Sequence, residues 1–372
     1  MDKIIFTIIT SHDPAARAAT GNPWLETAVT CGSALSQPVQ IKDLCPPCFL
    51  PLKDGKHRRA HSAYAVNDPR LSQVPNFDVK DSSFFRKWRE LPSPRDVQAQ
   101  AESQHLAGVN PDPRRDYRRD ASSGRPPPVV FEDMGLLIKW GSLVEIHEAF
   151  TLFAFHRLLN GHVPVPEVYG WRTEGDVKYI YMEYIRGQTL EQAWDKLEPE
   201  DRVTVCRELR TICDNLRCLE QDPSDPFVGS IARGPLYDRA LNSDYIPGEG
   251  PFTTVREFHD WFTFLPRRPM QDPYSVPVEP YRYELPDDCA IKSTHGDLHC
   301  SNIITSSSKP YRTLAIIDWE QSGWFPAYWE ARKAQFTALW GENWWTRYLP
   351  MILDQYAATE DSRWYYIASI GP

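Results

Sequence analysis

The chain has 372 residues, of which 41% are hydrophobic and 12% aromatic, and this is enough for a sizeable buried core. Its formal net charge of -9 argues against nucleic acid as a partner, because phosphate backbones are bound by a surplus of lysine and arginine. We therefore expect a globular, enzyme-sized protein, and a cationic or neutral substrate fits it better than nucleic acid.

Two features of the sequence bear on its compartment. The apolar run at residues 4–9 is too short to span a bilayer, and Asp2 beside Lys3 does not form the basic start of a secretory signal. The eight cysteines are scattered, without the framework of a small secreted domain, and the C-x-x-C at 45–48 lacks further zinc ligands nearby. We expect a cytoplasmic protein with reduced thiols and no membrane segment.

The first part of the chain has few structural signals. Residues 1–80 lack sustained periodicity and are predicted to form a poorly ordered extension. Ser93, Pro94 and Asp96 then form a helix start, and the helix should run toward Leu106. In the tract at 111–125, five arginines alternate with three aspartates. Such a tract could bind phosphate, but the alternation favours a solvated linker.

A lysine and a glutamate follow in a strand and a helix. Residues 129–131 and 136–140 are typical of strands joined by a turn, and Lys139 lies near the end of the second one. From Ser142 onward, apolar residues recur at helical spacing, and Glu148 belongs to this predicted helix. Taken alone, each of the two charges would be a commonplace surface group.

The most informative stretch lies at residues 293–302, followed by an apolar run that ends at Asp318. Asp297 precedes Asn302 by five residues, which is the spacing of the kinase catalytic loop. Residues 302–305 and 314–317 predict a hairpin that would return Asp318 to the neighbourhood of Asn302. An Asp and an Asn beside strands are often turn residues. Together, however, these groups could accept a proton from a hydroxyl and hold Mg²⁺ with oxygen ligands.

At these residues the chain resembles the aminoglycoside phosphotransferase and choline kinase-like family, whose members share the protein-kinase fold. The signatures are H-G-D-L-H-x-x-N at 295–302 and I-D-W-E at 317–320, and G-P-L-x-D at 234–238 is similar to a fungal branch. The resemblance implies an α+β, two-lobed fold, with a small, mostly β N-terminal lobe that carries one helix and a larger, mostly helical C-terminal lobe. The expected parts are an extension at 1–80 and lobes at 81–185 and 186–372.

The resemblance also implies site residues. Asp297 would be the catalytic base, and His295 would brace the catalytic loop by hydrogen bonding. Lys139 would hold the phosphates of ATP and be positioned by Glu148. The adenine would be contacted by Met182 and by the backbone of Glu183 and Ile185, and Mg²⁺ would be held by Asn302 and Asp318.

The function that fits these residues best is ATP- and Mg²⁺-dependent transfer of a phosphoryl group to a hydroxyl of a small molecule. A catalytically weak or inactive kinase-fold binding protein is the alternative, because Gly135 is the only glycine near the expected phosphate flap. A protein kinase is less favoured, since His-Gly-Asp replaces His-Arg-Asp and no Ala-Pro-Glu segment follows.

The acceptor is not specified by the sequence. Asp238, Glu257 and Asp260 could meet a cationic acceptor, with solvated surface charges as the alternative interpretation. The oligomeric state is likewise left open.

Overall fold

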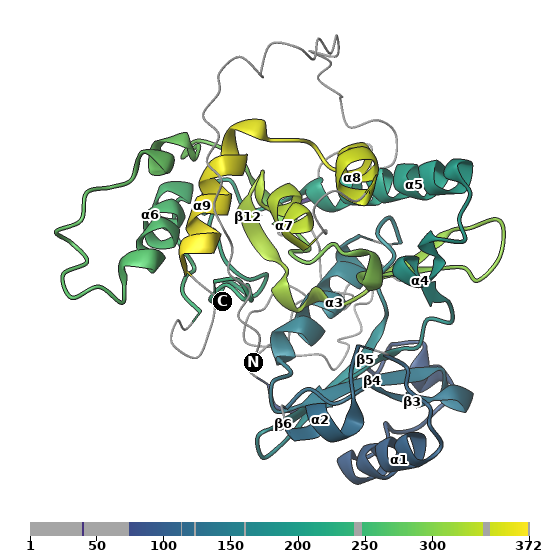
Figure 1. The fold of residues 1–372 in the computed structure, drawn as a ribbon. Helices are drawn as coiled ribbons and strands as arrows, with labels where there is room; N and C mark the ends of the chain where they lie inside the picture. The colour runs from purple at the N-terminus through teal and green to yellow at the C-terminus, as the bar shows by residue number, and fades with distance from the viewer. Residues whose placement is uncertain are drawn as a thin grey trace, which may run out of the picture.

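The computed structural model describes residues 39–40, 74–112, 114–122, 124–159, 161–241, 248–337 and 343–370. These residues form a small lobe built on an antiparallel sheet and a larger, mostly helical lobe beside it (Figure 1). The predicted α+β, two-lobed, protein-kinase-like fold is therefore confirmed.

A five-stranded sheet in the order β2-β5-β6-β4-β3 forms the centre of the small lobe, and all its neighbouring strands are antiparallel. Side chains alternate between the two faces of a strand. In β4, Leu136 and Ile138 are buried on one face, so Lys139 points to the other, toward the large lobe. The strands are β2 Phe77–Asp78, β3 Val129–Phe131, β4 Leu136–Gly141, β5 Val168–Glu174 and β6 Val177–Glu183.

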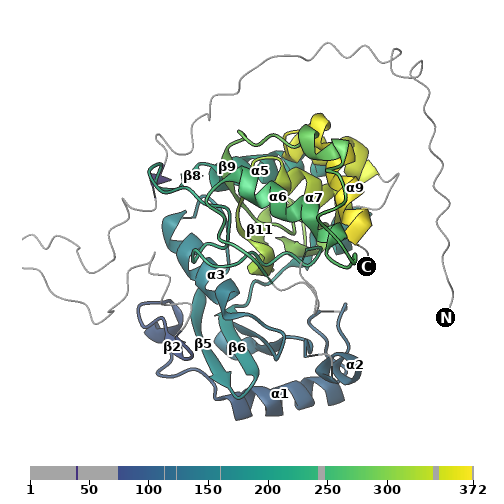
Figure 2. The ribbon, with the colours of Figure 1, turned by 90° about the vertical axis from the view of Figure 1, so that its left-hand side faces the viewer.

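The helices of this region are α1 Pro94–Leu106, α2 Tyr117–Ser122 and α3 Ile146–Leu158. The predicted start of α1 is confirmed: the Ser93 hydroxyl accepts from the Asp96 N–H at 3.3 Å, and the Asp96 carboxylate accepts from the Ser93 N–H at 2.9 Å. Helix α3 begins four residues later than the predicted start at Ser142 and lies between the sheet and the large lobe (Figure 2). Helices α1 and α2 add to the single helix expected for this lobe.

The predicted extension at 1–80 lies mostly outside the described residues, as does the C-x-x-C at 45–48. Of the described residues before 81, those at 39–40 and 77–78 form strands. Residues 77–78 form β2 and pair with β5, so the sheet begins before the boundary expected at 81. Farther upstream, β1 Val39–Gln40 pairs in parallel with β8 Leu219–Glu220.

Besides the β1-β8 pair, the described part of the large lobe combines helices with two small sheets, in which β10 lies between β11 and β7, and β12 pairs with β9. The hairpin predicted around residues 302–317 is present as β10 and β11. The strands are β7 Gln188–Thr189, β9 Ile291–Thr294, β10 Ile303–Thr305, β11 Thr313–Ile316 and β12 Gly323–Pro326. The helices are α4 Leu190–Trp194, α5 Pro199–Arg217, α6 Val255–Phe264, α7 Trp329–Thr337, α8 Leu349–Ile352 and α9 Glu360–Ile370.

Short helical turns complete the described structure. They are the 3₁₀ turns η5 Phe84–Arg86, η6 Glu132–Met134, η7 Leu265–Arg267, η8 Pro280–Glu284, η9 Cys300–Asn302, η10 Trp319–Gln321 and η12 Ala357–Thr359, and the π-helical turn η11 Trp344–Tyr348. Within the described ranges, no helix is both long enough and apolar enough to cross a membrane.

The hydrophobic core continues from one lobe into the other through α3. Phe155 of α3 packs edge-on against Trp319, with ring centroids 5.1 Å apart. Both side chains are fully buried. Because Trp319 directly follows Asp318, this contact ties the position of α3 to the loop that carries Asp318.

Candidate active site

The loop that follows β9 is held by His295. Its Nδ1 accepts from the Asp297 N–H at 3.1 Å, so Nε2 carries the hydrogen and donates to the Ile317 carbonyl at 3.0 Å. Gly296 has φ +80, and a Cβ there would lie 2.3 Å from the Gln321 carbonyl oxygen, so only glycine fits. His295 thus links the loop of Asp297 to the strand end before Asp318.

A buried carboxylate, which we did not predict, supports the same loop. Glu330 of α7 accepts from the backbone N–H groups of His295 and Gly296, the latter at 3.2 Å. Burial raises the pKa of Glu330, while the two backbone N–H donors oppose that rise. Glu330 is thus a positioning residue for the loop. In the sequence, Glu330 directly follows an aromatic stretch at 324–329, and this context gives no sign that it supports the catalytic loop.

Asp297 and Asn302 are direct neighbours. The Asn302 Nδ2 donates to the Asp297 carbonyl at 2.9 Å and to its carboxylate Oδ2 at 3.1 Å. The Ile317 N–H donates to the Asn302 carbonyl at 2.9 Å, which brings the next residue, Asp318, beside Asn302. Asp297 is only partly buried, so its carboxylate can be reached from the solvent.

Asp318 is held in an unusual backbone conformation. Its φ of 65 and ψ of 61 lie in the left-handed region, which a non-glycine residue adopts at a cost of order 1–3 kcal/mol and which is frequent at functional sites. Burial alone would raise the pKa of Asp318. The charges of Lys139 and Arg239 outweigh burial and hold this pKa well below its usual range, so the carboxylate is ionised.

Lys139 is surrounded by carboxylates. Its Nζ lies 2.6 Å from Glu148 Oε2, 2.6 Å from Asp318 Oδ1 and 3.2 Å from Glu320 Oε2. Burial would lower the pKa of Lys139, but these carboxylates raise it above its ordinary value, so the ammonium stays charged. Carboxylate oxygens of Glu148, Asp318 and Glu320 lie within 4.8 Å of one another. Lys139 therefore joins the small lobe to the polar centre of the large lobe.

Two arginines that we did not assign to the site also bind Glu320. Arg125 Nη1 lies 2.8 Å from Glu320 Oε2, and the Arg239 guanidinium contacts Glu320 Oε1. Arg114 Nη1 in turn donates to Ser301 Oγ at 2.7 Å and to Asn302 Oδ1 at 3.1 Å. The prediction that the arginine tract is a solvated linker is therefore wrong at Arg114 and Arg125, because their partners lie in the large lobe.

Arg239 is presented by a firmly anchored loop. The preceding Tyr237 stacks on His147 of α3, with ring centroids 3.6 Å apart. Asp238 is buried and accepts from Lys333 Nζ at 2.8 Å and from Trp329 Nε1 at 3.1 Å. These contacts on both sides fix the backbone immediately before Arg239.

The carboxylates considered for a cationic acceptor do not form one pocket. Asp238 is buried and forms an ion pair with Lys333. The alternative interpretation of Asp238 as a solvated surface charge is therefore wrong. Asp260 pairs with Arg282 at 2.8 Å, and Glu257 accepts from Thr253 Oγ1 at 2.7 Å. The Thr254 hydroxyl caps α6 by accepting from the Glu257 N–H at 3.1 Å.

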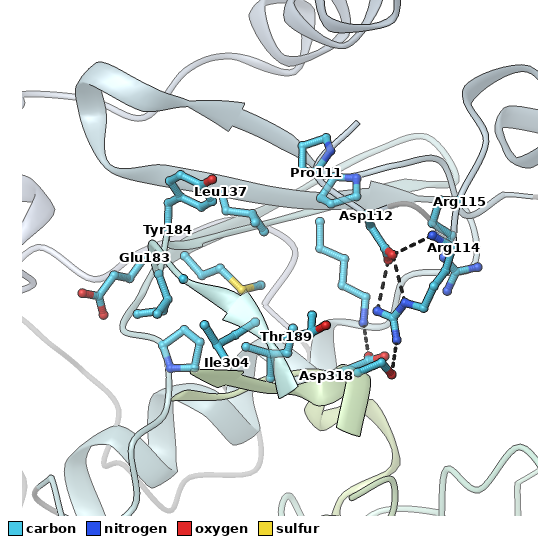
Figure 3. Close-up of a pocket in the computed structure, with 18 of the residues that line it drawn as sticks. Pro111, Asp112, Arg114, Arg115, Leu137, Glu183, Tyr184, Thr189, Ile304 and Asp318 are labelled. Carbon is cyan, nitrogen blue, oxygen red and sulfur yellow. Dashed lines mark hydrogen bonds and ion pairs between the residues drawn. The ribbon is translucent and has the colours of Figure 1, made fainter. Parts of the chain in front are cut away.

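A cleft of about 230 Å³ lies between the two lobes, with Asp318 at its polar end (Figure 3). Leu137 and Tyr184 line its other end, beside Glu183. The structure brings the predicted residues to this cleft in two groups: Met182, Glu183 and Ile185 line the end formed by β6 and the segment after it, and Lys139, Glu148 and Asp318 line the polar end. Asp297 and Asn302 adjoin the polar end through their contacts with the Asp318 loop.

Residues 142–366 match the sequence model of a family described as the phosphotransferase enzyme family. The match covers more than half of the chain. The chain belongs to this phosphotransferase family. Lys139 and the arginine tract precede the matched residues of this phosphotransferase, so their placement at the cleft is known from the structure and not from the family match.

Solved structures of aminoglycoside phosphotransferases are similar to this phosphotransferase at low identity. A thermostable mutant of APH(4)-Ia in its apo form is 15% identical over 66% of this chain and 80% of that chain, with a TM-score of 0.41. An aminoglycoside-3'-phosphotransferase of type VIII is 15% identical over 63% and 84%, with a TM-score of 0.41. The gentamicin–APH(2")-IIa complex is 14% identical over 66% and 78%, with a TM-score of 0.42. Comparison with curated protein sequences gives no match.

Proposed function

We propose that this phosphotransferase transfers the γ-phosphoryl group of ATP to a hydroxyl of a small molecule, with Mg²⁺ as the cofactor. The observation that carries the proposal is the convergence of Lys139, Asp318, Asn302 and Asp297 at the polar end of one cleft between the lobes. Phosphoryl transfer depends on this kind of arrangement, because catalysis consists of positioning and charge neutralisation.

The nucleotide fits the cleft with its base at the apolar end. Met182 and Leu137 supply apolar contact, and the backbone of Glu183 and Ile185 offers hydrogen-bonding groups for the adenine edge. Lys139 then binds the phosphates, while Glu148 at 2.6 Å fixes the direction of its ammonium. This placement leads the γ-phosphate toward Asp318 and, beyond it, Asp297.

Asp297 is the proposed general base. It accepts the proton of the acceptor hydroxyl as the hydroxyl oxygen forms a bond to the γ-phosphorus and the bond to the β-phosphate oxygen breaks, releasing ADP. A positioned base of this kind contributes about 10²–10⁴-fold to the rate. Asn302 orients the Asp297 carboxylate through its Nδ2 at 3.1 Å, and His295 and Glu330 hold the loop backbone.

Asn302 and Asp318 are the proposed ligands of Mg²⁺. Carboxylate and amide oxygens are the hard ligands that Mg²⁺ prefers. Both oxygens already receive cationic side chains, since Asn302 Oδ1 accepts from Arg114 and Asp318 Oδ1 pairs with Lys139, so the site suits positive charge. When bound, Mg²⁺ would neutralise charge on the phosphates during transfer.

An inactive binding protein is the second candidate, and it is favoured by one observation. The turn between β3 and β4, where a phosphate flap is expected, carries Glu132 and Asp133 in η6. Acidic side chains there would weaken nucleotide binding if nothing compensated for them.

One experiment separates the two candidates. The protein is incubated with ATP, Mg²⁺ and a panel of hydroxylated compounds that includes cationic and neutral members, and products are read by mass spectrometry. We expect one acceptor class to gain a phosphoryl group with equimolar release of ADP. ATP binding without any product or ADP release would favour the binding protein, and failure to bind ATP at all would overturn the proposal.

A further inference from the structure

The turn expected to cover the nucleotide's phosphates is poorly suited to do so. Of the described residues that line the cleft, none belongs to the turn at 132–135 between β3 and β4. Of its two carboxylates, Glu132 pairs with Arg186 at 3.1 Å, whereas the Asp133 carboxylate would repel phosphate oxygens. Binding of the phosphates therefore needs positive charge or N–H donors from another part of the chain.

The segment that connects α1 to β3, residues 107–128, supplies that charge. Pro111, Arg114, Arg115 and Arg125 of this segment line the cleft. Arg125 is engaged with Glu320, whereas the Arg115 guanidinium has no hydrogen bond or ion pair within the described part of the chain. Three guanidinium groups of this segment, from Arg114, Arg115 and Arg125, therefore lie at the cleft.

Arg114 reaches across the cleft to the turn that carries Ser301 and Asn302. Asp112 holds its guanidinium from behind, with Oδ1 2.9 Å from Nε and Oδ2 3.1 Å from Nη2. In front, Nη1 donates to Ser301 Oγ at 2.7 Å and to Asn302 Oδ1 at 3.1 Å (Figure 3 shows Arg114 between Asp112 and Asp318). The guanidinium therefore binds the same Asn302 oxygen that we assign to Mg²⁺, and it lies where the terminal phosphates would enter.

We propose that Arg114 is a nucleotide phosphate-binding residue that takes the place of the missing glycine-rich flap, and that Asp112 is its positioning residue. This inference rests on the proposed function. Guanidinium presents a planar fork of donors that matches phosphate oxygens, and Asp112 fixes that fork so that little ordering is needed on binding. When phosphates enter, Arg114 exchanges its bonds to Ser301 and Asn302 for bonds to phosphate, which releases Asn302 Oδ1 to the metal.

The test compares the affinities of adenosine, ADP and ATP, measured by isothermal titration calorimetry in the presence of Mg²⁺. The variants are Arg114→Ala, Arg114→Lys and, as a matched control from the same segment, Arg118→Ala, which alters an exposed arginine that does not line the cleft. Adenosine binding reports whether the cleft itself remains folded.

We expect Arg114→Ala to weaken ATP binding by about tenfold to a hundredfold, as the loss of a charge-assisted hydrogen bond implies. Adenosine affinity should stay unchanged, Arg114→Lys should recover part of the ATP affinity, and Arg118→Ala should match the wild type. An unchanged ATP affinity in Arg114→Ala, or an equal loss for adenosine and ATP, would overturn the role of Arg114. A wild-type protein that gains no affinity from the phosphates would instead overturn the proposed function itself, and the role of Arg114 with it.

Discussion

Lys139 of the small lobe and Asp318 of the large lobe are in direct contact, with Nζ 2.6 Å from Oδ1. The contact closes the polar end of the cleft and pairs the proposed phosphate ligand with the proposed metal ligand. Since Lys139 also binds Glu148 at 2.6 Å and Glu320 at 3.2 Å, it retains two carboxylate partners when Asp318 turns to a metal. The Lys139–Asp318 contact therefore links the two lobes and also lies where the proposed metal would bind.

Asp318→Ala should abolish the Mg²⁺ dependence of nucleotide binding. Wild-type affinity for ATP should rise when Mg²⁺ is added, because the Asp318 carboxylate would help to hold the metal, and the metal would neutralise charge on the phosphates. Calorimetric titration of ATP with and without Mg²⁺ measures this difference. Asp195→Ala, which alters an exposed aspartate after α4, is the matched control. The same Mg²⁺ enhancement in Asp318→Ala as in the control would show that Asp318 is no metal ligand.

Asp297→Asn should lose turnover and keep nucleotide binding. The amide preserves shape and the contact with Asn302 but cannot accept the hydroxyl proton, so the rate of phosphoryl transfer should fall by about 10²–10⁴-fold. ATP affinity should change far less than turnover, since the amide keeps the shape of the side chain and an acceptor oxygen for Asn302. Turnover is measured on the acceptor found in the mass-spectrometric screen, with Asp195→Asn as control. Wild-type turnover in Asp297→Asn would remove the assigned base.

The buried pair of Asp238 and Lys333 should be important for stability. Both side chains are buried, and the Lys333 ammonium lies 2.8 Å from Asp238. Lys333→Met should lower the free energy of unfolding by about 3–5 kcal/mol, because it leaves a buried carboxylate without its cation. Replacing both residues, with Asp238→Asn added, should recover part of that loss. Urea unfolding gives the values, and a single variant as stable as the wild type would contradict the buried pair.

His259 predicts a loss of stability in mild acid. Its ring is fully buried, with Nδ1 2.9 Å from Asp287 and Nε2 2.8 Å from the Tyr328 hydroxyl. Burial, only partly offset by Asp287, lowers the pKa of His259 from 6.5 to about 4. Between about pH 4 and pH 6.5 the unfolded chain therefore binds more protons at His259 than the folded chain does. The stability that the neutral His259 contributes is complete above about pH 6.5 and is lost as the pH falls toward 4.

Urea unfolding of the wild type and of His259→Gln, compared between about pH 7 and pH 5, measures that contribution. The wild type should lose about 1–3 kcal/mol more than the variant over this range. His147, whose pKa burial also lowers to about 4, is present in both proteins and cancels in the comparison. Equal pH dependence of the two proteins would contradict a buried neutral His259.

Much of the fold could be predicted because its signals are local. Ser93 and Pro94 mark the start of α1, and short apolar runs beside turn residues mark β4 and the hairpin of β10 and β11. The motif residues Asp297 and Asn302 lie five positions apart on one loop, so their contact needs no knowledge of distant segments.

The missed features depend on contacts between distant parts of the chain. Arg114 and Asn302 are 188 positions apart, and Asp238 and Lys333 are 95 apart. In the sequence, Arg114 stands among aspartates as a solvated linker would, and Asp238 stands in a loop. Arg114 bridges the lobes only because the arginine tract packs on the large lobe, and Asp238 is buried only because its loop packs on α7. No local sequence pattern encodes either contact.

Crystals of the protein grown with a non-hydrolysable ATP analogue and Mn²⁺, with the metal located by its anomalous scattering, test the proposed metal and phosphate sites most directly. We predict a metal peak bound by both Asn302 Oδ1 and the Asp318 carboxylate, with the terminal phosphate lying between that metal and Asp297. A metal and phosphates bound elsewhere, with Asp297 remote from the terminal phosphate, would contradict it.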